Sequence, residues 1–595
     1  MCGIAGYVGH RAAQPILHTA LARLEYRGYD SCGIAVVGEQ MVVYKNSGRV
    51  EEMTATAPVL SGNAGIGHTR WASCGLPTAE NAHPHLDCSR HIAVVHNGNI
   101  TNYLSLKIDL ETRGHVFLSG TDSEVIVHLI EEHYHGNVAD ALSLAVRQLE
   151  GSYAIVALHQ EEARLAAVKR GSALVVGLGD GENWVASDVN ALAEHTGRVM
   201  YLEEGDLAVI ERGAVVILNE GRPVERFVHP IEWQPDDGGK GGYAHFMLKE
   251  IHEQPRVLRE NIGNWLTTEM SPKLRLLWNR LYQPPMILGC GSSYYAGLTA
   301  RYFMEEMTSR PVRVELASEL NHRPETPEAG RLVIGLTQSG ETADTLNALN
   351  RLRQSGAGIL AFANVVRSSV TRIADQTMLL RAGPEISVAA TKTFTAQLVS
   401  LYAATLAAVG RDYNSNNGLE ARLKELPALV QMSLDDTEEV IDAAQWLTGF
   451  SNVICIGRGA HYPIAMEAAL KLKEVAYIHA EACSAGELKH GPLALLNSRT
   501  PVIAVFGSRD DTWETMLTAV REVKVRGAPV LALVPGDNAS VRQLADRVIS
   551  VPQADRRFQP AITAVTVQLL AYYTALALGC PIDRPRHLAK SVTVE

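Results

Sequence analysis

The chain has 595 residues, 46% of them hydrophobic and 20% charged, which is an ordinary composition for a soluble globular protein. At roughly 100–200 residues per domain, this length predicts three or four domains. Lys and Arg number 54 against 65 Asp and Glu, so the formal net charge is -11. This balance argues against a nucleic-acid partner and against an anionic membrane, because either would favour a basic surface.

The first residues and the cysteines indicate a cytoplasmic protein. The start Met1-Cys-Gly-Ile lacks a basic stretch followed by an apolar one, so we expect no secretory signal. The eight cysteines are scattered and form no CxxC pair, which is typical of reduced cytosolic thiols. The uncharged stretch from Gln559 to Ile582 is long enough for a membrane span. Because it stands alone and contains polar residues such as Gln568, we predict a buried core helix.

The first part of the chain, to about residue 218, predicts an α+β domain. Short apolar or alternating runs follow one another closely, which favours mostly antiparallel sheets with helices packed on them. Expected strands are Ile34–Val37, Met41–Tyr44, His91–Val95, Tyr153–Leu158 and Leu174–Leu178, and expected helices are Ala13–Leu24 and Asp122–Tyr134. The turn-rich segment from Trp233 to Gly242 indicates a linker.

Beyond the linker, apolar strands alternate with Gly/Ser loops and helices, the pattern of a parallel α/β sheet. This half also repeats itself: Met286–Tyr294 resembles Val453–Tyr462, and Leu332–Thr337 resembles Val502–Gly507. The offset of roughly 170 residues is too long for a solenoid and fits a duplicated domain. We therefore expect two similar α/β domains, joined near Asn414–Glu439.

Cys2 follows the initiator methionine and is a candidate nucleophile. Removal of that methionine would give Cys2 a free α-amino group, whose ordinary pKa of about 7.7–8.0 lets it accept the thiol proton. The resulting thiolate could attack a carbonyl carbon. Taken alone, an incidental cysteine is the simpler interpretation.

Residues 2–220 as a whole resemble the N-terminal-nucleophile glutamine amidotransferases. The resemblance is carried by Met1-Cys-Gly-Ile-Ala-Gly, Leu24-Glu-Tyr-Arg-Gly-Tyr-Asp-Ser, Gly67-His-Thr-Arg-Trp-Ala, Asn81-Ala-His-Pro-His, His96-Asn-Gly-Asn-Ile and Gly120-Thr-Asp-Ser-Glu. It implies an N-terminal-nucleophile (Ntn) hydrolase fold of αββα layers. By this resemblance Cys2 is the nucleophile, and Asn97 and the backbone N–H of Gly98 form the oxyanion hole. The resemblance also implies that Arg70 binds the α-carboxylate of glutamine and that Asp122 binds its ammonium group. Trp71 would gate the passage of ammonia.

The resemblance has one departure in this domain, and one alternative competes with it. Ser73-Cys-Gly stands where the family usually has Thr-His-Gly, which changes the side chain at Cys74. The alternative is a zinc site, since several residues of ligand type lie close together at His83, His85, Cys88, His91 and His96. His91 and His96 flank a predicted strand and face opposite sides by its period of two, so we expect no metal.

In the second half, the strand Leu332–Leu336 leads into Thr337-Gln-Ser-Gly-Glu-Thr and then a helix from Ala343 to Leu352. Hydroxyl groups and free N–H groups at a strand-to-helix turn form an anion site that needs no lysine. Simple helix capping by Ser or Thr would explain one such turn. A second turn at Cys290-Gly-Ser-Ser favours a phosphate.

This half is similar to the sugar isomerase (SIS) domains of the glucosamine-6-phosphate synthase family, and the similarity covers the whole chain. It implies that the sugar phosphate and nearby hydroxyls are bound by Ser292, Ser293, Thr337, Gln338, Ser339, Thr342, Val388 and Ala589. Ala390 stands where the family usually has a serine, so one hydrogen bond to the sugar is expected to be missing.

The resemblance also implies the residues of the isomerase chemistry. Glu467, Lys471 and Glu474 fall on one helical face by their spacing, which by itself is typical of a solvated salt-bridge stripe. The family match instead implies proton transfer between C1 and C2 by Glu474, with Lys471 assisting and Glu467 orienting it. His490 would open the sugar ring, and Lys590 would form a Schiff base with the ketose. His587 replaces the family's common Asn.

The sequence thus predicts a glutaminase domain (2–218), a linker with a connecting helix (219–275), two SIS domains (276–415 and 444–585) and a catalytic tail (586–595). The implied reaction converts fructose 6-phosphate and L-glutamine into glucosamine 6-phosphate and L-glutamate, the first step toward UDP-N-acetylglucosamine. No cofactor is expected, since nothing is oxidised overall, and the family implies a homodimer. Two alternatives remain open: another glutamine amidotransferase, and a non-catalytic sugar-phosphate sensor.

Overall fold

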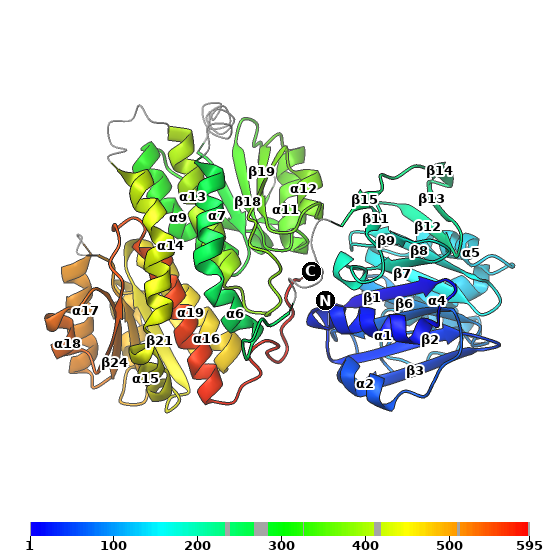
Figure 1. The fold of residues 1–595 in the computed structure, drawn as a ribbon, viewed down its shortest axis with the longest axis horizontal. Helices are drawn as coiled ribbons and strands as arrows, with labels where there is room; N and C mark the ends of the chain where they lie inside the picture. Colours follow the sequence, from blue (N-terminus) through cyan, green and yellow to red (C-terminus); the bar gives the residue numbers. More distant parts are fainter. Residues whose placement is uncertain are drawn as a thin grey trace. The chain divides into compact units, whose positions relative to one another are not determined.

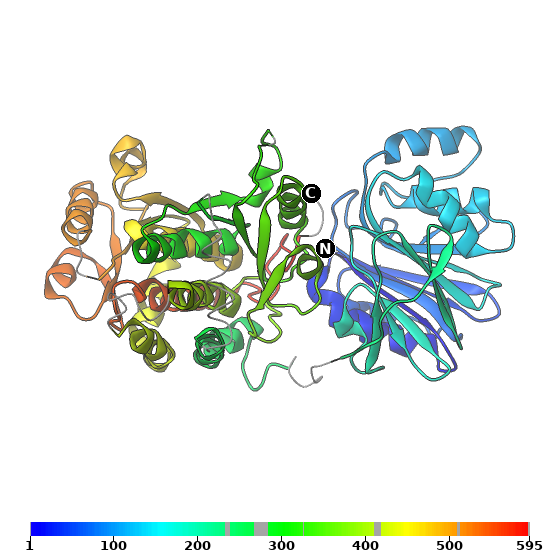
Figure 2. The same ribbon diagram turned by 90° about the horizontal axis from the view of Figure 1, so that it is seen from above.

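The computed structural model describes residues 2–231, 239–266, 284–324, 326–409, 418–508 and 512–592. The chain forms two compact units, Met1–Asp237 with Ala589–Glu595, and Gly238–Leu588 (Figures 1 and 2). The predicted linker and connecting helix, 219–275, lie outside the described residues over 232–238 and 267–275, and the expected first SIS domain lies outside them over 276–283. Residues 410–417, at the predicted join between the SIS domains, also lie outside them.

The N-terminal unit contains two antiparallel sheets. Among the described residues, one sheet has the order β15 (His229–Pro230), β11 (Arg198–Tyr201), β9 (Val175–Leu178), β10 (Asn183–Ala186), β1 (Gly3–Val8), β4 (Ala64–Arg70), β2 (Ser31–Val37) and β3 (Met41–Ser47). The other has the order β14 (Arg222–Val224), β13 (Val215–Asn219), β12 (Asp206–Glu211), β8 (Arg164–Arg170), β7 (Gly151–His159), β6 (Ile92–Ile100) and β5 (His85–Leu86). Because β14 and β15 belong to these sheets, we place the end of this domain near residue 231 rather than 218.

The strand periodicity of two builds the layers of this unit. In β1, Ile4 and Val8 enter a core between the sheets, whereas Ala5 and Tyr7 pack under α1 (Ala13–Leu24) and α2 (Val50–Thr56). The second sheet buries its opposite face against α4 (Glu124–His133) and α5 (Val138–Ala145). This is the predicted αββα arrangement, and the fold class is confirmed.

The C-terminal unit contains two parallel sheets with the same strand order. One is β17 (Arg313–Leu316), β16 (Met286–Gly289), β18 (Leu332–Leu336), β19 (Gly358–Ala363) and β20 (Gln376–Leu379). The other is β22 (His479–Ser484), β21 (Asn452–Gly457), β23 (Val502–Val505), β24 (Val530–Pro535) and β25 (Arg547–Val551). When the strands of each sheet are numbered along the chain, their order across the sheet is 2-1-3-4-5 in both cases. The predicted duplication is therefore confirmed.

One apolar core joins the two halves of this unit. It draws side chains from both sheets and from α7 (Gln254–Trp265), α9 (Ser292–Thr308), α13 (Lys392–Val409), α14 (Leu419–Asp435), α16 (Tyr462–Ala476) and α19 (Gln559–Ala577). The remaining described helices include α3 (Tyr103–Thr112), α6 (Phe246–His252), α10 (Ala317–Leu320), α11 (Ala343–Gln354), α12 (Ser369–Ile373), α15 (Glu438–Leu447), α17 (Trp513–Val525) and α18 (Ala539–Leu544). The two SIS-type halves therefore form one packed body.

Helix α19 is long and apolar enough to cross a membrane by length and composition, but 83% of that window is buried inside the structure. Its polar residues are satisfied within the core. Gln568 Oε1 accepts a 2.8 Å hydrogen bond from Gln254 Nε2, and Gln568 Nε2 donates to Thr391 O at 3.2 Å. Thr395 Oγ1 in turn donates to Gln254 Oε1 at 2.7 Å. The predicted core helix is confirmed.

This buried chain of hydrogen bonds generates a stability prediction. We expect Gln568→Ala to lower the free energy of unfolding by about 1–3 kcal/mol, because it leaves buried polar partners unsatisfied. Leu576→Ala on the same helix is the matched control, since Leu576 is exposed. The thermal midpoint of the full chain should fall clearly for the first variant and stay near wild type for the second. Equal midpoints for both variants would contradict this role of Gln568.

Candidate active site

The N-terminal strand holds Cys2 beside the end of β4. Gly3 pairs with Thr69, and the Gly3 N–H donates to Thr69 Oγ1 at 3.1 Å. A Cβ on Gly3 would lie 2.6 Å from Leu24 Cβ, so only glycine allows this approach. Cys2 Sγ accepts from the Trp71 backbone N–H at 3.3 Å and lies 3.6 Å from Trp71 O. Among the described residues, the half-buried thiol is thus held by the backbone of Trp71.

The electrostatics around Cys2 favour a thiol until a base acts on it. Burial is the largest effect and raises the pKa of the Cys2 thiol, while Arg70 lowers it and Asp122 raises it by their charges. These two residues therefore lie within electrostatic reach of the sulfur. A nucleophile in such a site needs a nearby group to accept its proton.

Asn97 lies in β6 with its amide fixed on both sides. Its Nδ2 donates to the Cys2 carbonyl oxygen at 2.9 Å, and its Oδ1 lies 3.0 Å from His68 Nε2. His68 Nε2 is also 3.0 Å from the His96 carbonyl oxygen. Both neighbours are acceptors, so we assign the imidazole proton to Nε2. Burial lowers the pKa of His68 to about 3, which keeps the ring neutral. The sequence analysis missed this positioning role of His68, although His68 lies inside one of the matching motifs.

Gly98 follows Asn97 in a conformation that requires glycine. Its φ is 135°, and a Cβ there would lie 2.0 Å from the Ser152 carbonyl oxygen. No other residue would fit without moving β7. The backbone at the expected oxyanion hole is therefore fixed by strand packing.

Arg70 is buried and binds the loop that follows Trp71. Its guanidinium donates to the carbonyl oxygens of Gly75 at 3.0 Å, of Leu76 at 3.1 Å and of Cys74. Asn81 ties the same loop to the next one, because it donates to Leu76 O and accepts from the Gly120 N–H, both at 2.9 Å. Cys74, where the sequence departs from the family pattern, has a different side chain. Arg70 binds the backbone carbonyl of Cys74, so this contact does not depend on that side chain.

Asp122 is buried just before α4 and accepts from the Ile100 backbone N–H at 2.8 Å. A second carboxylate that the sequence analysis missed is Asp30, which accepts from the Ala72 N–H at 2.8 Å and so fixes the chain after Trp71. The structure brings five of the six predicted residues of this site into direct or electrostatic contact, with Trp71 contacting Cys2 through its backbone: Cys2, Asn97, Arg70, Trp71 and Asp122. The sixth residue, Gly98, adjoins them in β6.

In the first SIS-type sheet, the predicted phosphate loops follow adjacent strands. β16 and β18 pair in parallel. The chain runs from β16 to β17 in one direction across the sheet, and from β18 to β19 in the other. Ligands of open α/β sheets bind at such a switch point, outside the carboxyl ends of the strands. Ser292 and Ser293 begin α9 after β16, and the loop after β18 carries Thr337, Gln338, Ser339 and Thr342.

The loop after β18 is held by its own hydroxyl groups. Thr337 Oγ1 accepts from the Gly340 N–H at 3.0 Å, and Ser339 Oγ accepts from the Glu341 N–H at 3.1 Å. Gly340 has a φ of 70°, and a Cβ there would lie 2.0 Å from Ser368 Oγ. Thr342 occupies the N-cap position of α11 but makes no side-chain capping bond. Simple capping therefore does not account for Thr342.

Glu467, Lys471 and Glu474 do lie together on α16, as their spacing predicts, and the cluster is not a solvated stripe. Glu467 and Lys471 are fully buried, with Lys471 Nζ 3.4 Å from Glu467 Oε1 and also paired with Glu474. Burial raises the pKa of Glu467 to about 7. Burial alone would lower the pKa of Lys471, but the two carboxylates raise it overall and keep the ammonium charged.

This cluster reaches the first SIS-type half. Ser292 Oγ donates to Glu467 Oε1 at 3.0 Å, and Gln397 Nε2 donates to Ser293 Oγ at 3.0 Å. Glu467 Oε2 is buried and accepts no hydrogen bond from the described residues. The predicted phosphate serines and the acid–base cluster therefore adjoin each other in one unit.

Four predicted residues lie apart from these contacts. Val388 is buried, and its N–H donates to the Asp583 carbonyl oxygen at 3.1 Å. His490 is exposed at the end of a short 3-10 turn, Glu487–His490. Ala589 and Lys590 are half-buried and belong to the compact unit of the N-terminal domain, whereas Glu474 belongs to the other unit. The tail begins at Arg586, whose N–H donates to the Tyr477 hydroxyl at 2.7 Å, one turn beyond Glu474.

Comparison with known proteins matches both parts of the chain. The SIS domain model matches residues 286–407 and 447–578, and the glutamine amidotransferase domain model matches residues 68–194. A glutamine–fructose-6-phosphate aminotransferase (isomerizing) from Aquifex aeolicus is 42% identical over 601 residues, covering 100% of both chains. The enzyme of that name from Symbiobacterium thermophilum is 44% identical over 613 residues, again covering 100% of both.

A solved structure agrees with these relatives. The C-terminal domain of the glucosamine–fructose-6-phosphate aminotransferase from Francisella tularensis is 36% identical, with a TM-score of 0.55, and covers 58% of this chain and 100% of that one. Identities above 40% over the full length of both chains show common descent of every domain together. The chain therefore belongs to the family of isomerizing glutamine–fructose-6-phosphate aminotransferases.

Proposed function

We propose that this chain converts D-fructose 6-phosphate and L-glutamine into D-glucosamine 6-phosphate and L-glutamate. The observation that carries the proposal is the buried Glu467–Lys471–Glu474 cluster beside Ser292, in the same chain as the Cys2–Asn97 site. The relatives' names specify the same pair of activities. Glutamine hydrolysis consumes one water, and replacement of the sugar carbonyl oxygen by ammonia releases one, so the overall reaction balances.

In the glutaminase step, the α-amino group takes the proton of the Cys2 thiol, and the resulting thiolate attacks the carboxamide carbon of glutamine. The same proton then passes to the leaving nitrogen. The raised pKa of the thiol makes that base necessary. Asn97 Nδ2 and the Gly98 N–H would donate to the oxyanion. Arg70 would bind the α-carboxylate and Asp122 the ammonium group. Ammonia leaves, and water hydrolyses the thioester to glutamate.

In the sugar step, the phosphate binds at the loops after β16 and β18, held by Ser292, Ser293, Thr337, Gln338, Ser339 and Thr342, with Val388 and Ala589 near the sugar. His490 opens the ring by acid–base transfer. Lys590 forms an imine with the ketose carbonyl, and ammonia, shielded from water in its passage past Trp71, displaces that lysine. Glu474 then moves a proton from C1 to C2. Lys471, kept charged between two carboxylates, would stabilise the intermediate.

Two other functions are separated from this one by a single assay. A non-catalytic sugar-phosphate sensor would release no glutamate, and another amidotransferase would release it independently of fructose 6-phosphate. Glutamate release that increases with fructose 6-phosphate, accompanied by glucosamine 6-phosphate, supports the proposal. We further propose a cytoplasmic homodimer, in keeping with eight free thiols.

The first prediction concerns the nucleophile. We expect Cys2→Ala to lower glutamine hydrolysis at least about 1,000-fold, because no other group can form the thioester. Isomerisation of fructose 6-phosphate should persist, since the sugar step is assigned to residues other than Cys2. Cys580→Ala, a half-buried thiol elsewhere, is the matched control and should retain both activities. Comparable glutamate release by Cys2→Ala would remove Cys2 from this role.

The second prediction concerns Lys590. Borohydride added together with fructose 6-phosphate should reduce an imine and increase the mass of the chain by one hexose phosphate, mapped to the C-terminal peptide. Lys392 and Lys471 are buried and paired with carboxylates, so they serve as internal controls that should stay unmodified. An adduct on either of them, or on Lys473, contradicts the assignment.

The third prediction concerns a site shared between subunits. We infer from the family resemblance that His490 acts in the site of the partner, and its exposure in a turn followed by Gly491 at a φ of 143° is compatible with that role. His490→Ala and Lys590→Ala dimers should each be nearly inactive. A hybrid dimer, co-expressed with two tags, should recover about half of wild-type synthesis. If the hybrid is as inactive as both parents, His490 does not act across the dimer.

A further inference from the structure

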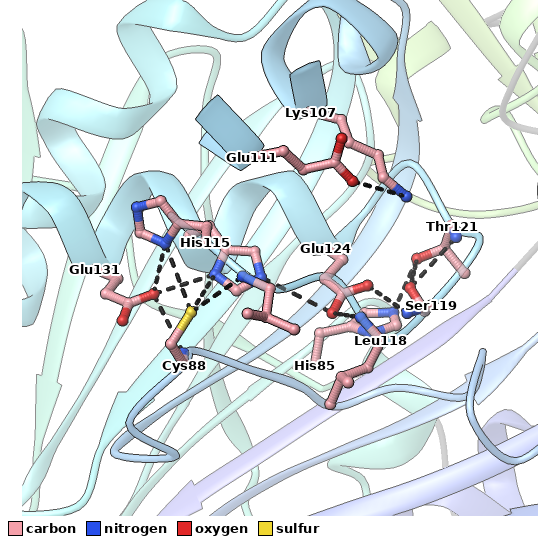
Figure 3. A network of polar contacts seen from close by, with 12 residues as sticks. His85, Cys88, Lys107, Glu111, His115, Leu118, Ser119, Thr121, Glu124 and Glu131 are labelled. Carbon is pink, nitrogen blue, oxygen red and sulfur yellow. Dashed lines mark hydrogen bonds and ion pairs between the residues drawn. The ribbon is translucent and has the colours of Figure 1, made fainter. Parts of the chain in front are cut away.

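A second cluster of titratable side chains lies outside both catalytic groups, in the N-terminal unit (Figure 3). Cys88 lies in the turn between β5 and β6, His115 lies in the loop after α3, and His128 and Glu131 lie one turn apart on α4. One ligand atom from each of the four residues lies within 4.8 Å of all the others. Three separate segments of chain thus meet through groups that commonly bind metals.

The distances between the ligand atoms come close to those of a tetrahedral cation site, although none lies within the ideal range. Cys88 Sγ is 3.7 Å from His115 Nδ1 and 3.7 Å from His128 Nδ1. Glu131 Oε2 is 3.0 Å from the first of these nitrogens and 3.1 Å from the second. With Zn–S of about 2.3 Å and Zn–N or Zn–O of about 2.0–2.2 Å, tetrahedral ligand atoms lie about 3.3–3.6 Å apart.

The four side chains also interact with one another directly. Glu131 Oε2 accepts from the Cys88 backbone N–H at 3.2 Å, and the Glu131 carboxylate also interacts with the Cys88 thiol. The Val116 backbone N–H points to the same sulfur at 3.5 Å. A divalent cation would bind the thiolate form of Cys88, and a thiolate with a carboxylate matches the charge of that cation.

Each imidazole also has a carboxylate behind its other nitrogen. His115 Nε2 is 3.5 Å from Glu132 Oε1, and His128 Nε2 is 3.8 Å from Glu124 Oε1. Glu124 is itself fixed by the backbone N–H groups of Leu118 at 2.8 Å and Ser119 at 2.6 Å. Metal-bound histidines are typically oriented by such carboxylates, which fix the tautomer that leaves Nδ1 free to coordinate.

We propose that Cys88, His115, His128 and Glu131 form a structural Zn²⁺ site. One thiolate, two imidazoles and one carboxylate in a closed tetrahedral set are the donors that zinc accepts, and no position remains open for a catalytic water. The sequence analysis considered a metal here but grouped Cys88 with His83, His85, His91 and His96. None of those four histidines belongs to the cluster.

The site would stabilise the segment that carries part of the glutamine pocket. Asp122 lies two residues before Glu124, and β6, which carries Asn97, begins four residues after Cys88. A cation bound to three separate segments links α4 to the loop after α3 and to the turn before β6. The proposed role is therefore structural, and no reaction step passes through the metal.

The test measures bound zinc on the reduced full-length protein. Wild type is loaded with Zn²⁺, desalted and analysed for metal per chain, and we expect one. Cys88→Ser and His115→Gln change one exposed and one half-buried ligand, so these variants should fold and should bind zinc at least about 10-fold more weakly. His91→Gln and Cys580→Ser are the matched controls, and Cys2→Ala excludes binding at the catalytic thiol. All three should retain one zinc.

Two further readouts decide the outcome. Co²⁺ in place of Zn²⁺ should give a thiolate charge-transfer band in wild type that Cys88→Ser lacks. A chelator should lower the thermal midpoint of wild type and leave that of Cys88→Ser unchanged. Failure of wild type to retain zinc, or equal retention by wild type, Cys88→Ser and His115→Gln, would overturn the proposal.

Discussion

The ion cluster of Lys471 between Glu467 and Glu474 constrains the whole C-terminal unit. A buried ammonium is tolerated only when carboxylates compensate for its lost hydration, and removing one partner of a buried pair costs about 3–5 kcal/mol. Glu467 provides one of these carboxylates from the same helix, α16. Glu467 also accepts a hydrogen bond from Ser292, which belongs to the first SIS-type half. The two halves of the duplication are thereby fixed together at the point where chemistry is proposed.

The same cluster holds its two carboxylates in different environments. Burial raises the pKa of Glu467 to about 7, whereas Glu474 has a side chain that is 20% exposed and faces the same ammonium. Two carboxylates in different environments can divide orienting and proton-carrying roles between them. The described residues around Cys2 and Asn97 are positioned by other contacts than such an ion pair. There, strand packing against Gly3 and Gly98 and the neutral imidazole of His68 position Cys2 and Asn97.

Much of this could be predicted from sequence, because the signals were local. The spacing of Glu467, Lys471 and Glu474 within one helix predicts a shared face, and the strand periodicity predicts the layers. Burial of that face was not predictable, since α16 owes it to packing against α19 and the first SIS-type half. The roles of His68, Asn81 and Asp30 were also missed, because their partners lie on other strands or loops. The assigned catalytic roles themselves stay predictions.

The Cys88 cluster shows the same limit most clearly. Its members are separated by 26, 12 and 2 intervening residues, so no short motif brings them together. Their meeting depends on α4 packing onto the second sheet, the contact that also positions the chain at Asp122. His83 and His85 are close to each other in sequence, but neither belongs to the Cys88 cluster. His85 Nε2 instead lies 3.1 Å from Thr121 Oγ1. In a layered fold, tertiary packing rather than spacing along the chain decides which donors converge on a common point.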